Sequence, residues 1–313
     1  MPQRDLVIDC DTGVDDALAL LFALRSTSLN VLGITTVAGN VTLEKVIRNT
    51  LIVVERSGRK VRVLPGAARP LFGTWRTSEL VHGNDGMADM FPDPASKPGE
   101  EHAVDFLIRT AMQSPQPVEW LTQGPLTNIA LALTREPRLE ERVRSMVMMA
   151  GGITAGNTTP AAEFNVAVDP EAAEIVFRSR IPKTMLAIEP IDEGAWLMPE
   201  DGEQLLASKA PWAHMIGQLM QWQRERFKAF GADKPEVMYD PAATAVLIDP
   251  SIAESKMMHV AIETQGRFTR GMTVVDRRWF RDLLGDQPKP NVNVVTRIDN
   301  ARYRRLFLDT LLA

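Results

Sequence analysis

Four acidic residues stand within eight positions near the start of the chain, in the run Asp-Cys-Asp-Thr-Gly-Val-Asp-Asp at 9–16. Asp9 and Asp11 follow a short apolar run and would share one face of a strand, because side chains alternate along a strand. Gly13 allows a tight turn that returns Asp15 and Asp16 to the same place at the start of a helix. A helix N-cap would account for Asp15 alone. Four converging carboxylates repel one another unless a cation lies among them, and oxygen ligands favour calcium or magnesium, so the run predicts a divalent cation site.

The segments that must position this acidic turn alternate between strand and helix patterns. Apolar runs predict strands at 6–8, 31–37, 61–64, 118–122 and 146–149, and amphipathic runs predict helices at 15–25, 43–57, 102–114 and 126–134. Apolar strands that alternate with helices indicate a mostly parallel sheet with helices on both faces. We therefore expect an α/β fold with an open, Rossmann-like sheet. Ligands bind beyond the carboxyl ends of the strands in such sheets, so the active-site loops should lie there.

The rest of the chain gives no sign of a domain boundary, so we expect residues 1–313 to form a single domain. The stretches 72–99, 154–160 and 231–236 are rich in Gly, Pro or polar residues and predict surface loops. Residues 204–230 are expected to be helical. Their aromatic side chains would either join the core or line a pocket, and they are Trp212, Trp222, Phe227 and Phe230.

Composition excludes several classes of protein. The chain has 313 residues, 45% hydrophobic and 24% charged, which are ordinary values for a globular protein. The net charge is −5 and the basic residues are dispersed, so we expect neither nucleic acid nor an anionic membrane as a partner. Cys10 is the only cysteine, which excludes an intramolecular disulfide and a metal held by several cysteines. Since there is also no basic and apolar leader and no long apolar stretch, we expect a cytoplasmic protein.

Six further blocks follow the acidic turn in order. They lie at 35–40 (Thr-Thr-Val-Ala-Gly-Asn), 82–83 (His-Gly), 124–128 (Gly-Pro-Leu-Thr-Asn), 151–152 (Gly-Gly), 157 with 163–165 (Asn, then Glu-Phe-Asn) and 169–173 (Asp-Pro-Glu-Ala-Ala). Together with the turn they resemble, over nearly the whole chain, the nucleoside hydrolases of the inosine-uridine-preferring type. Thr12 stands where that family usually has proline. The resemblance implies a catalytic domain that hydrolyses ribonucleosides to ribose and free nucleobase and assembles as a homodimer or homotetramer.

The resemblance also implies roles for individual residues. A calcium ion would be held by the carboxylates of Asp11, Asp16 and Asp240 and by the main-chain carbonyl of Gln123. Asp9 matches a supporting position. The residues expected to contact the ribose hydroxyls are Asp15, Asn40, Asn157, Glu163 and Asn165.

Simpler roles stay open for some of these residues. Asn40 and Asn157 also suit turns, and Asp240, before Pro241, also suits a helix N-cap. Glu163 and Asn165 would share a strand face if their segment were extended, an arrangement that suits a diol.

Cleavage of the bond between ribose C1′ and the base nitrogen develops positive charge on the sugar. The resemblance implies direct attack by water, with the metal lowering the pKa of that water and Asp11 accepting its proton as general base. The leaving base needs protonation or stabilisation, and the family usually has a histidine directly before the last aspartate ligand, where this chain has Tyr239. Because the usual pKa of tyrosine is about 10, we expect Tyr239 to orient the base more than to protonate it. His82 is the other candidate acid, although a loop histidine is also commonly a surface residue.

Two other functions stay open on the sequence. A calcium-dependent protein that binds nucleosides or ribose without turnover is one, because Tyr239 replaces a usual catalytic group. A phosphatase with an aspartate nucleophile is the other, since such enzymes also have an aspartate pair after a strand. In those enzymes glycine directly follows the second aspartate, whereas here Thr12 precedes Gly13.

Overall fold

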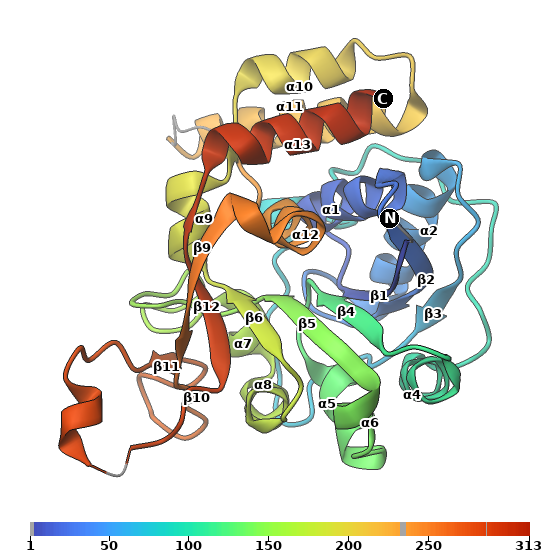
Figure 1. Cartoon of the computed structure of the whole chain (residues 1–313). Helices are drawn as coiled ribbons and strands as arrows, with labels where there is room; N and C mark the ends of the chain where they lie inside the picture. The colour runs from blue at the N-terminus through green and yellow to red at the C-terminus, as the bar shows by residue number, and fades with distance from the viewer. Residues whose placement is uncertain (1–2, 232–235, 286) are drawn as a thin grey trace.

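The computed structural model describes residues 3–231, 236–285 and 287–313. Its centre is an eight-stranded sheet in the order β3-β2-β1-β4-β5-β6-β12-β9, with helices on both faces (Figure 1). Neighbouring strands are parallel except β9, which runs antiparallel to β12. The strands are Arg4–Cys10 (β1), Leu29–Thr36 (β2), Val63–Pro65 (β3), Val118–Thr122 (β4), Val143–Met149 (β5), Lys183–Leu186 (β6), Ala253–Met258 (β9) and Val292–Ile298 (β12). The predicted α/β class is confirmed.

Each face of the sheet buries its own apolar core. Leu6 and Ile8 of β1 join one core and Val7 joins the other, as the alternation of side chains along a strand requires. The helices over the first core include α1 (Val14–Arg25), α2 (Leu43–Ser57), α12 (Tyr239–Ile248) and α13 (Asn300–Leu312). Those over the second are α4 (Ala103–Gln113), α5 (Thr127–Arg135), α6 (Leu139–Arg142) and α8 (Pro170–Arg178).

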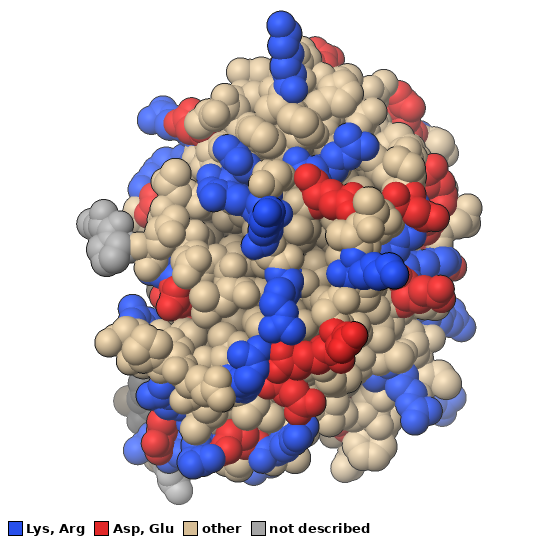
Figure 2. All heavy atoms as spheres, turned by 90° about the vertical axis from the view of Figure 1, so that its right-hand side faces the viewer, with Lys and Arg blue, Asp and Glu red and all other residues tan. Residues whose placement is uncertain are grey.

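Short elements surround this sheet. They are α3 (Glu79–His82), α7 (Phe164–Val168), α9 (Ile188–Gly194), the antiparallel pair β7 (Trp196–Leu197) and β8 (Glu236–Val237), the antiparallel pair β10 (Val260–Ile262) and β11 (Thr273–Val275), and the 3-10 turns η1 (Pro250–Ile252) and η2 (Arg281–Leu284). Within the described residues, no helix is long and apolar enough to cross a membrane. Basic and acidic side chains lie beside one another on the face shown in Figure 2.

The predicted strands and helices of residues 6–149 are confirmed, with ends that shift by at most three residues. Most of the segment expected to be helical, 204–230, is helical, but it belongs to two helices, α10 (Pro199–Leu206) and α11 (Pro211–Ala229). Pro211 begins α11, where its missing N–H costs nothing, whereas inside a continuous helix it would break the hydrogen bonding. The loop expected at 72–99 contains α3, and the one expected at 231–236 falls mostly at 232–235, outside the described residues.

Helices α10 and α11 approach closely through a glycine. A Cβ atom on Gly217 would lie 2.3 Å from the backbone nitrogen of Leu206, far inside van der Waals contact. Gly202 differs, because the nearest atom to its Cβ would be the flexible Cε of Met220 at 3.3 Å. Of these two glycines, packing requires only Gly217. Its helix, α11, carries part of the cavity wall described below.

We expect Gly217→Ala to lower the free energy of unfolding by about 1–3 kcal/mol, because the added methyl group forces the two helix backbones apart. Gly202→Ala is the matched control. It should be neutral or slightly stabilising, since alanine favours a helix by about 1 kcal/mol over glycine. Urea unfolding of both variants measures the difference, and equal midpoints would show that the α10 and α11 contact tolerates a side chain.

Candidate functional site

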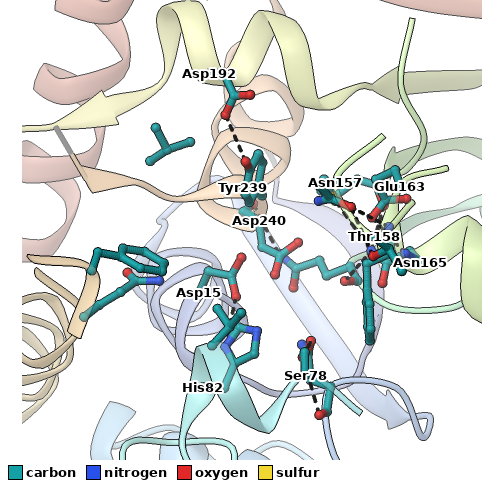
Figure 3. Close-up of a pocket in the computed structure, with 18 of the residues that line it drawn as sticks. Asp15, Ser78, His82, Asn157, Thr158, Glu163, Asn165, Asp192, Tyr239 and Asp240 are labelled. Carbon is teal, nitrogen blue, oxygen red and sulfur yellow. Dashed lines mark hydrogen bonds and ion pairs between the residues drawn. The ribbon is translucent and has the colours of Figure 1, made fainter. Parts of the chain in front are cut away.

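A cavity of about 630 Å³ opens at the carboxyl ends of the parallel strands. Of the predicted site residues, all but Asp11 and Asp16 line it, and those two are completely buried. Figure 3 shows side chains from α1 (Asp15), α3 (His82) and α12 (Tyr239 and Asp240) pointing into this space. The predicted residues that line it are Asp15, Asn40, His82, Gln123, Asn157, Glu163, Asn165, Tyr239 and Asp240. The fold thus brings together residues that lie more than 200 positions apart.

Carboxylates form the floor of the cavity. One oxygen each of Asp15, Asp16 and Asp240 lies within 4.8 Å of the others. Asp11 is fully buried, with its Oδ2 accepting a hydrogen bond of 2.7 Å from the backbone N–H of Asn40. The Oδ1 atoms of Asp11, Asp15 and Asp16 accept no hydrogen bond from any described residue. Buried carboxylate oxygens without partners are very costly, so this all-oxygen cluster fits a hard divalent cation.

The electrostatics of the cluster agree with this fit. Without a cation, burial and the neighbouring charge of Asp15 raise the pKa of Asp16 to about 8. Burial, followed by the charge of Asp16, raises the pKa of Asp11 well above its ordinary value. Burial, followed by the charge of Asp15, does the same to the pKa of Asp240. Each raised pKa means that the carboxyl group holds a proton more tightly than usual when no cation is bound. A bound cation would replace that proton.

Two glycines allow the strand ends to close around Asp11. A Cβ on Gly39 would lie 2.1 Å from Asp11 Oδ2, and one on Gly124 would lie 2.7 Å from Asp11 Oδ1. These contacts explain why glycine stands in both loop blocks of the sequence. The turn itself is held by Gly13, whose N–H donates to Asp16 Oδ2 at 2.9 Å. Thr12, at the position where the family pattern has proline, contributes a hydroxyl 2.7 Å from that of Thr50.

Asp9 lies beneath the floor and contacts no other acid by hydrogen bond. Its Oδ1 accepts from the hydroxyl of Thr35 at 2.5 Å and from Nδ2 of Asn128 at 2.8 Å. Burial nevertheless raises the pKa of Asp9 to about 7. The supporting position expected for Asp9 agrees with these contacts, which tie the ends of β1 and β2 to α5.

The segment of Glu163 and Asn165 is a helix and not a strand, so a shared strand face is the wrong description. Glu163 is the N-cap of α7 and accepts from the backbone N–H groups of Gly151, Asn165 and Val166. The Glu163 carboxylate satisfies free N–H groups in the first turn of α7, a role that the strand pattern does not distinguish. Burial raises the pKa of Glu163.

The amide side chains of the site are also held by the fold. Nδ2 of Asn165 donates to the backbone carbonyls of Gln123 and Met149, each at 3.1 Å. Asn40 Oδ1 accepts from the Ser78 hydroxyl at 2.6 Å, and Asn157 Oδ1 accepts from a backbone N–H of α7. These contacts orient the three amides at the cavity wall before any ligand binds.

Asp240 is the second residue of α12, whose N-cap is Met238, so the N-cap role considered for Asp240 is wrong. The side chain of Gln123 fixes this end of the helix. Its Nε2 donates to the Asp240 carbonyl at 3.3 Å and to the Thr244 hydroxyl at 3.2 Å. The end of β4 is thereby tied to the first turn of α12.

His82 is buried and not a surface residue, with 7% of its surface exposed. Its Nδ1 accepts a hydrogen bond of 3.1 Å from the backbone N–H of Val14 and lies 3.9 Å from Asp15 Oδ1. Burial lowers the pKa of His82, although the charge of Asp15 opposes that shift. A neutral imidazole with its proton on Nε2 is therefore the form that this environment favours.

The outer wall of the cavity contains two residues, Asp192 and Gln223, that the sequence analysis did not identify. The Tyr239 hydroxyl donates to Oδ1 of Asp192 at 2.9 Å, and both side chains line the cavity (Figure 3). Gln223 and Phe227 of α11 line it as well, so the pocket alternative holds for Phe227. Trp222, Trp212 and Phe230 do not line it. Arg226 is used elsewhere, donating to two backbone carbonyls of α3.

Glu189 was also missed, and it holds the loop that carries Asn157. Its carboxylate accepts from the backbone N–H groups of Ile153, Thr154 and Ala155 and from the Thr154 hydroxyl. The Gly-Gly pair at 151–152 and the loop expected at 154–160 were signals of a chain reversal here, but neither marks Glu189 as its partner.

The chain is similar to proteins of one known family. The family model described as inosine-uridine preferring nucleoside hydrolase matches residues 6–305. The pyrimidine-specific ribonucleoside hydrolase RihA of Escherichia coli is 37% identical over 313 residues, covering 98% of this chain and 97% of that protein. RihA of Photobacterium profundum is 40% identical over 286 residues, covering 89% and 91%.

Solved structures agree with the sequence relatives. A plant nucleoside hydrolase superposes with a TM-score of 0.92 at 29% identity and covers 100% of both chains. An inosine-guanosine nucleoside hydrolase superposes with a TM-score of 0.91 at 27% identity, covering 99% of this chain and 98% of that one.

Removal of the cation should make stability depend on pH. The folded protein without metal binds protons at Asp9 and Asp16, whose pKa values are about 7 and about 8, while the unfolded chain has already released them. Stability of the metal-free protein therefore falls as pH rises through this range. We expect the Tm of chelated protein to fall from about pH 5 to about pH 8, and its difference from the Tm of calcium-loaded protein to widen.

Asp16→Asn is the control for this experiment. With one buried charge fewer, the chelated variant should show a shallower decline of Tm with pH. If chelated and calcium-loaded wild-type proteins have the same Tm at every pH, the acids hold no cation.

Proposed function

The chain belongs to the inosine-uridine preferring nucleoside hydrolase family, and we propose that it releases ribose from ribonucleosides at this cavity with a bound calcium ion and with Asp11 as general base. It is a hydrolase that acts on N-glycosyl bonds. The observation that carries the residue assignments is the floor of buried carboxylates whose oxygens lack partners, lying under a wall of fixed amides.

The proposed calcium ligands are the carboxylates of Asp11, Asp16 and Asp240 and the main-chain carbonyl of Gln123. Calcium takes six to eight oxygen ligands, whereas these four groups supply four if each gives one oxygen. The remaining positions are open to substrate and water. When bound, the cation supplies positive charge that lowers the pKa of water and attracts the ribose hydroxyls. Asp15 contributes charge to the same floor, and its position at the cavity surface suits contact with the sugar.

Asp11 is suited to accept the proton of the attacking water. Its Oδ2 is fixed by the N–H of Asn40, while its Oδ1 has no hydrogen-bond partner among the described residues. One oxygen thus orients the carboxylate and the other is available for a proton. As the bond to the base breaks, positive charge develops on the sugar directly above these acids, and they stabilise it.

We propose that the ribose hydroxyls are bound by Asp15, Asn40, Asn157, Glu163 and Asn165. Nδ2 of Asn165 is already used by two carbonyls, so its Oδ1 is the atom that it can offer to a hydroxyl. Because these groups are fixed before binding, they hold the sugar in place against the water and lower the entropic cost of the reaction.

Neither candidate acid suits protonation of the leaving base. His82 is buried with a lowered pKa and accepts a backbone N–H, and the proton of Tyr239 is directed to Asp192. We therefore propose that the base leaves with help from solvent and from packing against Phe227, while Tyr239 orients it.

Pyrimidine ribonucleosides are the proposed substrates, because the curated relatives at 37% and 40% identity are named pyrimidine-specific. Assembly as a homodimer or homotetramer, a single catalytic domain over residues 1–313 and a cytoplasmic location are proposed on the resemblance and on the single cysteine.

A panel of nucleosides tests the function. We expect release of ribose and free base from uridine and cytidine at higher kcat/KM than from inosine and adenosine, and loss of turnover in excess chelator with recovery on added calcium. 2′-Deoxyuridine is the matched control and should be poor, because it lacks one of the two hydroxyls that the site fixes. Nucleoside binding without ribose release would support the binding-protein alternative, and phosphate release from a phosphomonoester would support the phosphatase.

Substitution separates the roles of the acids. Asp11→Asn should lower kcat by about 100-fold to 10,000-fold, because an amide cannot accept the proton of water. Asp15→Asn should raise KM and lower kcat, since it weakens contact with the ribose. Asp309→Asn, at an exposed position of α13, should change neither constant. Near-normal turnover of Asp11→Asn with calcium bound would mean that another group is the base.

A further inference from the structure

The pair formed by Tyr239 and Asp192 has no part in water activation or ribose binding. The hydroxyl of Tyr239 donates to Asp192 Oδ1 over 2.9 Å, so the pair joins α12 to α9 across the cavity wall. Tyr239 directly precedes Asp240, and its ring lies between the acidic floor and Asp192 (Figure 3). The pair therefore lies where a nucleoside seated on the floor would extend its base.

The direction of this hydrogen bond fixes what Tyr239 offers to a ligand. A phenol has one proton, and an ionised carboxylate only accepts hydrogen bonds. The proton of Tyr239 thus points to Asp192, and the lone pairs of the phenol oxygen are what remain. Because the ordinary pKa of tyrosine is about 10, the hydroxyl keeps its proton at neutral pH. Tyr239 acts toward the cavity as an acceptor.

The side chain of Gln223 also presents a hydrogen-bond acceptor at this wall. Gln223 of α11 lines the cavity with only 4% of its surface exposed, and its Oε1 is buried without a hydrogen bond from any described residue. The wall also contains two cations, the half-buried Arg224 and the exposed Lys228, and Asp192 is itself exposed. The half-buried Tyr239 and the buried Gln223 therefore both present an oxygen acceptor at this wall.

We propose that Asp192 is a specificity-determining residue, which makes the Tyr239 hydroxyl a hydrogen-bond acceptor and thereby selects ribonucleosides whose base presents an N–H group at this wall. The inference rests on the proposed function. Asp192 acts through Tyr239 and is a positioning residue. The N3–H of uridine and the exocyclic amino group of cytidine are donors of the required kind. A base whose donor is replaced by a methyl group would leave the Tyr239 oxygen without a partner, and a site built this way rejects such analogues strongly.

The test compares Asp192→Ala, Tyr239→Phe and the double variant on three kinds of substrate. These are uridine and cytidine, their N3-methyl and N4,N4-dimethyl analogues, and 4-nitrophenyl riboside, which carries no N–H. In the wild type, at least one parent nucleoside should exceed its methylated analogue in kcat/KM by about 10-fold or more, the size of one buried hydrogen bond. Asp192→Ala should reduce this ratio, because the Tyr239 proton is then able to turn toward the base. Its rate on 4-nitrophenyl riboside should stay within about twofold of the wild-type rate.

The double variant shows whether Asp192 acts through Tyr239. In the Tyr239→Phe background, Asp192→Ala should cause no further loss in the ratio of kcat/KM between a parent nucleoside and its methylated analogue. Glu193→Ala removes the neighbouring exposed acid of α9, which does not line the cavity, and should leave every ratio unchanged. The Tm and calcium content of each variant identify any that is misfolded.

Three results would overturn the inference: an unchanged ratio in Asp192→Ala, an equal loss on 4-nitrophenyl riboside, or the same effect of Asp192→Ala in both backgrounds. Failure of the proposed function has a different signature, because wild-type protein would then release no ribose from any nucleoside. Wild-type turnover combined with any of the three results refutes only the role of Asp192.

Discussion

Repulsion among Asp11, Asp15, Asp16 and Asp240 is the interaction on which the rest of the structure depends. The fold places these acids where β1 ends and α1 begins, and it removes almost all water from two of them. The N-terminal end of α1 opposes some of this repulsion, since its free N–H groups carry partial positive charge. Protons relieve the remainder when no cation is bound, as the raised pKa values of Asp11, Asp16 and Asp240 indicate, and a bound cation would take their place.

The other acids around the cavity are stabilised in a different way, by neutral donors. Glu163 and Glu189 each accept three backbone N–H groups, and Asp9 accepts from a threonine and an asparagine. No lysine or arginine lies among the described residues that form the floor. The floor therefore keeps its negative charge for the metal and for the sugar, and the same acids that would destabilise an empty site favour the charge that develops in the reaction.

The sequence predicted the parts of the site that depend on local pattern. The acidic turn, the glycines beside it and the strands of residues 6–149 were found, because each rests on spacing within a few positions. The shared strand face considered for Glu163 and Asn165 required an extended segment, and the segment is instead a helix that Glu163 caps. Asp192 and Glu189 escaped prediction because their contacts join α9 to segments that lie more than 30 positions away, and no local pattern marks such partners.

The cluster on the floor joins an early and a late part of the chain. Asp15 and Asp16 come from the first helix, and Asp240 arrives with α12, which the Gln123 side chain ties to β4. During synthesis on the ribosome, the first two carboxylates are therefore made long before the third. A chain released before residue 240 keeps the repulsion but lacks the group that completes the cation site. A cation held by all three carboxylates would stabilise finished chains more than unfinished ones, and a cell that degrades unstable protein would remove the unfinished ones first.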